Sequence, residues 1–187
     1  MAYNVFGHCY FFEDAIETKN LLEDNIAFLT KRSFSLLNTD MTPASYWITN
    51  PDNILRRNRA AGSDRYGFWF DLKEHPTGPS FNPTICPINV PLGEFSNNVA
   101  HSNGVYGVRV FHGHAPRKYP CLPIDDVNGT NPSITAVFKD ILSYKNMDNG
   151  FIIEQSGDVR LENFIAADNL VAGAEYSLTD ETIDGKA

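Results

Sequence analysis

One spacing recurs along this chain and constrains its fold more than any other feature. An apolar residue is followed by a small residue five places on, by Asn or Ser eight places on and by Gly twelve places on. Four copies are complete: Leu55-Ala60-Ser63-Gly67, Phe95-Ala100-Asn103-Gly107, Phe138-Ser143-Asn146-Gly150 and Leu161-Ala166-Asn169-Gly173. An earlier copy starts at Leu22 and keeps Ala27, but Thr30 and Phe34 occupy its last two positions. Self-similarity of this kind is typical of a solenoid.

The segments between the copies indicate an all-β solenoid. Only Glu13–Leu29 could form a helix, and its apolar residues fit strands as well. Elsewhere short apolar alternation is broken by Asn, Gly and Pro. Phe138 and Leu161 are 23 residues apart, which suits one coil of a parallel β-helix. We therefore expect a single domain over residues 1–187, with about five coils of roughly 23 residues each.

Larger distances between the other copies predict insertions within the coils. The candidates are Lys31–Thr42, Leu72–Val90 and His112–Asn131. The last two are rich in Pro and Gly, as surface loops are. Insertions that project from a solenoid often form its functional face.

The register also predicts which residues stack on one another. Each copy of the repeat ends in a Gly that should permit a left-handed or tight bend before a short strand. Residues one and three places after the Gly should face inward, namely Phe68, Phe70, Val108, Val110, Phe151 and Ile153. Two rows of asparagines should form hydrogen-bonded ladders between coils, one of Asn25, Asn58 and Asn98, the other of Asn103, Asn146 and Asn169.

Composition narrows the range of partners. The formal charge of −8 argues against nucleic acid, because phosphate binding needs a basic surface. No apolar run is long enough to span a membrane, so we expect no membrane contact by this segment. Phosphate-binding, dinucleotide-binding and zinc-protease motifs are missing, and the pair His112-x-His114 is a weak metal signal. We therefore predict no cofactor and no metal.

Four arginines resemble an anion-binding patch, but the register pairs two of them. Arg56 should lie over Glu23, and Arg57 over Asp24, in the preceding coil. Arg59 and Arg65 remain unpaired in this scheme and could contact an acidic ligand.

Trp69 and Arg109 share one outward position in successive coils. They could form a cation–π pair, or bind a sugar ring and its carboxylate. The alternative is surface packing beneath an inserted loop. Carboxylates such as Glu13, Asp14 and Glu74 could act as acid and base, but spacing in a β-helix selects no pair, so no catalytic residue is assigned.

The cysteines and one sequon indicate candidate sites of disulfide formation and N-glycosylation. Cys86 and Cys121 each lie in a Pro-rich insertion of consecutive coils, so a disulfide between them is feasible. Cys9 is flanked by aromatic residues and is expected to be a buried thiol. Asn128-Gly129-Thr130 is an N-glycosylation sequon in a loop.

Several longer runs resemble one family over nearly the whole chain. LLNTDMTPASYWITNPDN, AAGSDRYGFWF, HPTGPSF, VPLGEFSNNVAHSNGVYG and NMDNGFIIEQSGDVRLENFIAADN together resemble the parallel β-helix region of the fibrocystin-L family. The wider group includes fibrocystin and the G8-domain cell-surface and secreted hyaluronidases. This resemblance implies a right-handed parallel β-helix inside a large extracellular protein that is anchored in the membrane by another segment.

The function expected from the resemblance is that of a non-catalytic module at the cell surface. Such a module would present its loops to a glycan or to an extracellular protein, and would pack against neighbouring coils or domains of its parent chain. The alternative is a carbohydrate-active enzyme that depolymerises hyaluronan or a related acidic polysaccharide. Fold alone does not decide, because β-helices host both roles. A cleft beside the outward ladder with converging carboxylates would favour the enzyme.

Overall fold

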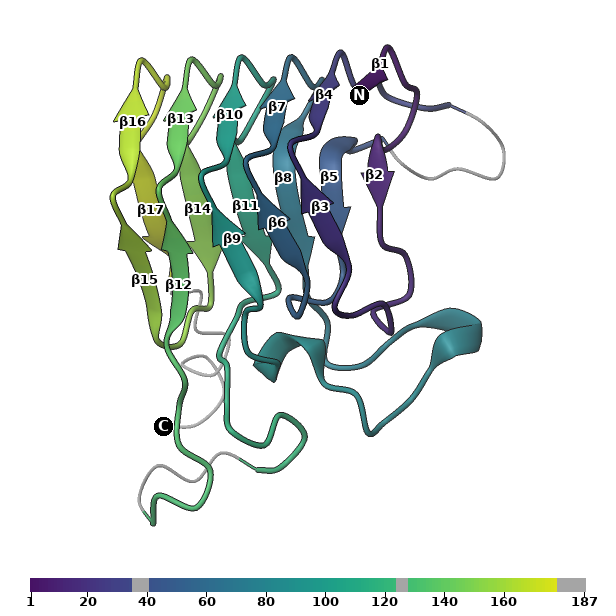
Figure 1. The fold of residues 1–187 in the computed structure, drawn as a ribbon, viewed down its shortest axis with the longest axis vertical. Coiled ribbons are helices and arrows are strands. Elements are labelled where there is room, and N and C mark those ends of the chain that lie inside the picture. Colours follow the sequence, from purple (N-terminus) through teal and green to yellow (C-terminus); the bar gives the residue numbers. More distant parts are fainter. Residues whose placement is uncertain (35–40, 124–127, 178–187) are drawn as a thin grey trace, which may run out of the picture.

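The computed structural model describes residues 1–34, 41–123 and 128–177 (Figure 1). Within these ranges the regular structure is all strand, apart from two single turns of 3₁₀ helix, η1 (Gly78–Ser80) and η2 (Pro87–Asn89). The strands form three parallel sheets. The first sheet contains β1 (Ala2–Tyr3), β4 (Ile26–Phe28), β7 (Arg59–Ala61), β10 (Val99–His101), β13 (Leu142–Tyr144) and β16 (Ile165–Ala167). The second sheet contains β2 (Tyr10–Phe11), β5 (Ala44–Ile48), β8 (Tyr66–Asp71), β11 (Val108–Phe111), β14 (Phe151–Glu154) and β17 (Ala174–Ser177). The third sheet contains β3 (Leu21–Glu23), β6 (Ile54–Arg56), β9 (Glu94–Ser96), β12 (Ala136–Lys139) and β15 (Val159–Glu162).

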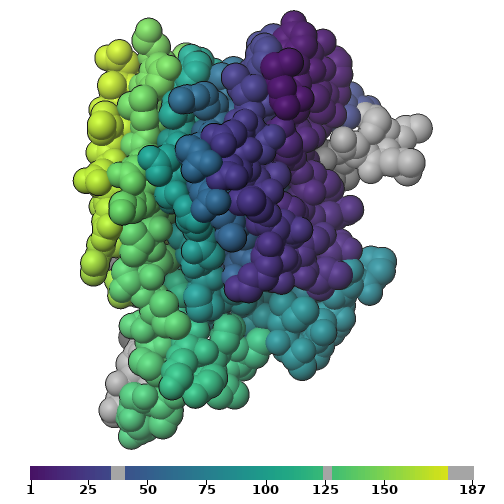
Figure 2. Space-filling view, viewed as in Figure 1, coloured from purple at the N-terminus to yellow at the C-terminus, as the bar shows by residue number. Residues whose placement is uncertain are grey.

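The chain visits the three sheets in turn and then repeats, so the fold is a parallel β-helix, as predicted. In the third sheet Leu22 pairs with Leu55, Leu55 with Phe95, Phe95 with Phe138 and Phe138 with Leu161. The repeated apolar residue of the sequence therefore marks the same position in five successive coils. Glu13–Leu29, the one segment that could have been helical, supplies β3 and β4 instead. The coils lie side by side from β1 to β17 (Figures 1 and 2).

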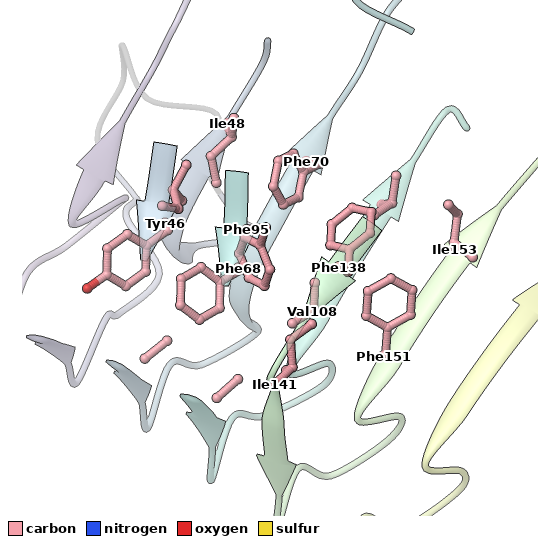
Figure 3. Close-up of a cluster of buried hydrophobic side chains, with 14 of the residues drawn as sticks. Tyr46, Ile48, Phe68, Phe70, Phe95, Val108, Phe138, Ile141, Phe151 and Ile153 are labelled. Carbon is pink, nitrogen blue, oxygen red and sulfur yellow. The ribbon is translucent and has the colours of Figure 1, made fainter. Parts of the chain in front are cut away.

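Aromatic and aliphatic side chains fill the space between the three sheets (Figure 3). The six residues predicted to face inward are at most 1% exposed. Rings stack from coil to coil, with 4.5 Å between the ring centroids of Tyr46 and Phe68 and 5.5 Å between those of Phe95 and Phe138. Burial of each such side chain contributes about 1.5–3 kcal/mol to folding, so the core accounts for most of the stability of the stack.

The repeated glycines are required for a different reason from the one expected. Gly67, Gly107 and Gly150 do not have positive φ, so they form no left-handed bend. They lie one above another, and a Cβ atom on Gly67 or Gly107 would lie 2.5 Å from the carbonyl oxygen of the glycine in the next coil. The missing side chain therefore permits the close approach of neighbouring coils.

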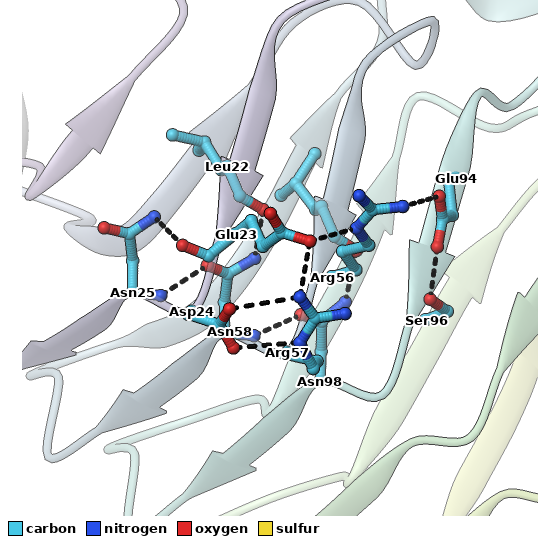
Figure 4. A network of polar contacts seen from close by, with 11 residues as sticks. Leu22, Glu23, Asp24, Asn25, Arg56, Arg57, Asn58, Glu94, Ser96 and Asn98 are labelled. Carbon is cyan, nitrogen blue, oxygen red and sulfur yellow. Dashed lines mark hydrogen bonds and ion pairs between the residues drawn. The ribbon is translucent and has the colours of Figure 1, made fainter.

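The first predicted asparagine ladder is confirmed (Figure 4). Oδ1 of Asn58 accepts a hydrogen bond from the Asn25 backbone N–H at 3.1 Å, and Oδ1 of Asn98 accepts from the Asn58 N–H at 2.9 Å. The Asn98 amide nitrogen donates to the Leu55 carbonyl at 2.8 Å. Each amide thus satisfies the backbone of a turn that is buried between coils.

The second ladder is also confirmed. The backbone N–H of Asn103 donates to Oδ1 of Asn146 at 3.2 Å, and that of Asn146 donates to Oδ1 of Asn169 at 3.1 Å. Ser63 continues this row by donating its N–H to Oδ1 of Asn103 at 3.1 Å. Both ladders hold the turns in one register along the helix axis.

Two of the predicted insertions leave the same corner of the helix. One follows β8 and the other follows β11, and both return to the third sheet, at β9 and β12. Their described residues project below the coils in Figures 1 and 2. The remaining predicted insertion, Lys31–Thr42, includes residues 35–40, and His112–Asn131 includes residues 124–127. Both stretches lie outside the described part of the chain. The corner after the second sheet is therefore where the described insertions gather.

Candidate functional site: a groove on the outer face of the second sheet

A groove crosses the coils on the outer face of the second sheet, at the carboxyl ends of its strands. It consists of two adjoining pockets with volumes of about 280 Å³ and 540 Å³. Lys73 lines both pockets, and the two pockets together are called the groove here. The smaller pocket is lined by Phe11, Glu13, Asp14, Ala15, Trp47, Thr49, Asp71, Lys73, His75 and Thr77. The larger pocket is lined by Lys73, Glu74, Ile88, Phe111, His112, Glu154 and Gln155.

Asp71 is the last residue of β8 and lines the smaller pocket. Its side chain is only 6% exposed, and Oδ1 lies 3.5 Å from His112 Nε2. Oδ2 lies 3.6 Å from Lys73 Nζ. One carboxylate therefore contacts a cation and an imidazole that belong to the two described insertions.

Aromatic rings form one end of the groove floor. Phe11 and Trp47 pack edge to face with 5.6 Å between ring centroids, and Trp47 lies 4.5 Å from Trp69 in the next coil. The Trp47 indole nitrogen is buried and has no hydrogen-bond partner among the described residues. Trp47 thus offers the groove an apolar ring, with Trp69 packed beside it in the next coil.

The insertion after β8 forms a wall of the groove. The Ser80 hydroxyl donates to Oδ2 of Asp14 at 2.6 Å, which ties the insertion to the loop between β2 and β3. Nδ1 of His75 lies 3.0 Å from the Ile85 carbonyl oxygen. Because a carbonyl only accepts, Nδ1 carries the proton, and Nε2 is the acceptor nitrogen in the neutral ring.

Trp69 and Arg109 pair as the register predicts, but they are enclosed. The Arg109 guanidinium carbon lies 5.2 Å from the Trp69 ring centroid and 4.1 Å from that of Phe111. Arg109 also donates to Glu154 Oε2 at 3.2 Å and to the Tyr66 hydroxyl at 3.1 Å. Trp69 is 7% exposed, inside a second apolar cluster that also contains Tyr66. The pair therefore packs the outer face of the sheet and presents little surface to a ligand.

The arginine pairs predicted from the register are present (Figure 4). Arg56 Nε lies 2.5 Å from Glu23 Oε1, and Arg57 Nε lies 2.9 Å from Asp24 Oδ1. Hydrogen bonds from Arg56 to Glu23, and from Arg57 to Asp24, hold the pKa of each carboxyl below its usual value. These exposed pairs link two coils of the stack.

Arg59 and Arg65 lie apart from the groove. Arg59 is exposed on β7, on the outer face of the first sheet. Arg65 is half-buried just before β8, and its buried Nε has no hydrogen-bond partner among the described residues. The structure therefore does not bring these two arginines together with Trp69 and Arg109 in one site.

Cys86 and Cys121 form a disulfide that joins the two insertions, with 5.3 Å between their Cα atoms. An apolar cavity of about 500 Å³ adjoins the disulfide, and residues of both insertions, including Ile85, Tyr119 and Leu122, line it. Cys9 is half-buried, its Sγ lies 3.2 Å from Thr30 Oγ1, and burial raises the pKa of its thiol. Asn128 is exposed in the insertion after β11.

The two histidines of His112-x-His114 point to different partners. His112 faces Asp71 in the groove, whereas His114 is fully buried and donates from Nε2 to the Val90 carbonyl at 2.9 Å. Burial lowers the pKa of His114 to about 4. Within the described ranges, no three His, Cys, Asp or Glu side chains are grouped so as to hold a metal ion.

Sequence reasoning missed Asp71 and Glu154 as groove residues. The repeat could have identified them, because each lies four places after a repeated glycine. Asp71 is two residues beyond Trp69, and Glu154 is two residues beyond Ile152, so both occupy the next outward position of their strands. Lys73, His75 and Glu74 have no place in the repeat, because they belong to the predicted insertion Leu72–Val90. Three carboxylates named from the sequence do line the groove, namely Glu13, Asp14 and Glu74.

The fold is a parallel β-helix, and sequence comparison identifies the family of β-helices to which the chain belongs. The model of the CEMIP beta-helix family matches residues 1–108, and the chain belongs to that family. None of the helical turns described here is long or apolar enough to cross a bilayer.

The curated relatives include two kinds of large protein. Fibrocystin-L of Mus musculus is 39% identical over 173 residues, which cover 92% of this chain and 4% of the relative. The human cell surface hyaluronidase CEMIP2 is 33% identical over 211 residues, which cover 90% of this chain and 15% of the relative. The human cell migration-inducing and hyaluronan-binding protein is 31% identical over 226 residues, which cover 96% and 16% respectively. The chain thus spans a small fraction of these relatives.

Proposed function

We propose that this chain is a non-catalytic β-helix module of an extracellular or cell-surface protein, and that it binds a glycan chain in the groove of the second sheet. The main support for this proposal is the lining of the groove. An aromatic floor at Phe11 and Trp47 adjoins walls of carboxylate, hydroxyl and imidazole groups. Sugar rings present an apolar face and a rim of hydroxyls, so this combination suits them. The groove crosses several coils and therefore fits an extended chain.

The groove is pre-formed, which favours binding. Ser80 fixes one wall through Asp14, and the Cys86–Cys121 disulfide restrains both insertions. A site held in place in this way loses less conformational entropy when a ligand binds. In this proposal Trp69 and Arg109 pack the outer face of the sheet beside Trp47, Arg59 and Arg65 make contacts outside the groove, and Asn128 carries an N-linked glycan.

The cell-surface location rests on the relatives. CEMIP2 is named a cell surface hyaluronidase, and another relative is named a hyaluronan-binding protein. A disulfide between two loops suits an oxidising compartment. Because the chain spans so little of these relatives, the activities in their names are not carried over to it in this proposal.

The test is glycan binding by the purified chain and by two variants. Trp47→Ala removes the sugar platform and should weaken binding about tenfold. Thr77→Arg places a bulky side chain among the groove carboxylates and should abolish binding while leaving the core untouched. Val171→Arg, at an exposed turn far along the stack, is the matched control. Equal glycan binding by Thr77→Arg and Val171→Arg would exclude the groove as the binding site.

A second candidate is depolymerisation of a glycan in the same groove. It is favoured by the contact between Asp71 and His112, since a carboxylate that orients an imidazole can support general acid–base chemistry. Size analysis of hyaluronan incubated with the chain, beside the Asp71→Asn variant, tests this candidate. Shortening of hyaluronan by the wild-type chain alone would replace the non-catalytic proposal with an enzymatic one.

A further inference from the structure

The groove carries a strong excess of negative charge. Five carboxylates line it, at Glu13, Asp14, Asp71, Glu74 and Glu154, whereas its only lysine is Lys73. The imidazoles of His75 and His112 also line it. A ligand in the groove therefore meets mainly hydrogen-bond acceptors.

The cations near the groove are already paired. Lys73 Nζ lies 3.6 Å from Asp71, and the Arg109 guanidinium lies 3.2 Å from Glu154. A ligand carboxylate would have to compete with a protein carboxylate for either cation. It would also meet Glu13 in the smaller pocket or Glu74 in the larger one, and both of these side chains are exposed. Two like charges about 4 Å apart repel by about 1 kcal/mol in bulk water and by about 4 kcal/mol near a protein surface.

From this charge arrangement we propose that the groove binds an uncharged glycan chain and discriminates against polyanionic glycans such as hyaluronan. The inference rests on the proposed function and names its ligand class. Carboxylates accept hydrogen bonds from sugar hydroxyls and amides, and the strongest of these bonds involve a charged acceptor. The aromatic floor at Phe11 and Trp47 packs against the apolar face of a sugar whatever its charge.

Arg59, the exposed arginine that the sequence suggested for ligand binding, lies on a different face of the β-helix. Arg59 projects from β7 of the first sheet and cannot neutralise a ligand in the groove of the second sheet. Binding of an acidic glycan, if it occurs through Arg59, would therefore be insensitive to changes in the groove. This separation allows the two surfaces to be distinguished by mutation.

The experiment measures the affinity of the whole chain for three probes of matched length. These are a neutral hexamer of N-acetylglucosamine, a hyaluronan hexamer and a hexamer of lysine. We expect the neutral hexamer to bind at least ~10-fold more tightly than the hyaluronan hexamer. The variant Glu13→Gln/Glu74→Gln removes two exposed charges from the groove. It should bring the two glycans within about threefold of each other, because the repulsion is reduced.

The matched control is Glu162→Gln/Asp168→Asn, which makes the same change in net charge on a different part of the stack. It should leave the preference for the neutral hexamer unchanged. Tighter binding of hyaluronan than of the neutral hexamer, lost in Thr77→Arg, would overturn the ligand class while upholding the groove as a glycan site. Failure of both glycans to bind would overturn the proposed function itself. Binding of the lysine hexamer alone would instead assign the groove to a basic peptide and would overturn both.

Discussion

The side-chain amide of Asn103 donates to Oδ1 of Asn146 in the next coil at 2.9 Å, in a position where neither residue is more than 1% exposed. Oδ1 of Asn146 also accepts from the backbone N–H of Asn103. One side-chain oxygen therefore satisfies two buried donors of a neighbouring turn, and the ladder holds the coils in register.

Substitution of Asn146 should destabilise the chain strongly. Asn146→Leu leaves both Asn103 donors buried without an acceptor, so we expect a loss of roughly 2–4 kcal/mol in the free energy of unfolding. Urea denaturation measures the loss. Met147→Ala, at an exposed neighbour, should change the stability by less than about 0.5 kcal/mol. Similar unfolding midpoints for the two variants would contradict the structural role of the ladder.

A side chain at Gly107 should disrupt the stack. In Gly107→Ala the new Cβ would lie 2.5 Å from the Gly150 carbonyl oxygen, which is backbone and cannot move aside cheaply. We expect a loss of about 3 kcal/mol or more, as for severe overpacking.

The control for this prediction is Gly129→Ala. Its φ of +67° disfavours a side chain, but an added Cβ would meet nothing within 4 Å, so its cost should stay near 1–2 kcal/mol. If thermal unfolding showed Gly129→Ala to be the more damaging change, close approach would not be the reason for the repeated glycine.

The free energy of unfolding should decrease as the pH is lowered, because His114 is buried in its neutral form. Its pKa is about 4 in the folded chain, below the value of 6.5 that applies when the chain is unfolded. The unfolded state therefore binds a proton first, and stability is lost as the pH falls from 6.5 toward 4. Between pH 8 and pH 5 the loss from this residue should reach roughly 2 kcal/mol.

Comparison with His114→Gln isolates this contribution. The substituted side chain cannot titrate, so the decline in the variant's stability between pH 8 and pH 5 should be smaller by that same amount. The other histidines titrate in both proteins and cancel in the comparison. Parallel pH profiles of the two proteins would show that His114 is not the source of the decline.

Loss of the Cys86–Cys121 disulfide should loosen the insertions before it affects the coils. The two cysteines are 35 residues apart, and closing a loop of that length stabilises a folded chain by about 3–4 kcal/mol in the chain-entropy treatment. In Cys86→Ser/Cys121→Ser, limited proteolysis should cut within both insertions, while Cys9→Ser should leave the cleavage pattern unchanged. Cleavage first within the coils would contradict this order.

The coil architecture could be predicted from the sequence because each position of the repeat has one physical role. The apolar residue at Leu55 or Phe95 must fill the core, and the amide at Asn103 or Asn146 must serve buried turns. The glycine position was predicted correctly, but its reason was not. Close approach of two backbones depends on the neighbouring coil and is not visible in the local sequence.

The groove could be predicted only in part. Its outward strand positions follow from alternation, so Asp71 and Glu154 were within reach of the repeat. The wall residues Lys73, His75 and Glu74 belong to an insertion whose path is set by Pro-rich turns, by Ser80 bonding to Asp14 and by the disulfide. Burial of Trp69 beneath its aromatic neighbours likewise depends on residues from other coils.

At one corner of the helix, the segment that connects the second sheet to the third varies in length from coil to coil, whereas the strands on either side of it do not change their pairing. The chain passes this corner through Gln155–Asp158 in one coil, and through residues 72–93 and 112–135 in two others. The strands on either side keep their partners in all three cases. Chain can therefore be added or removed at this corner without changing the scaffold, so related β-helices could acquire different ligands by exchanging one loop while every coil stays in place.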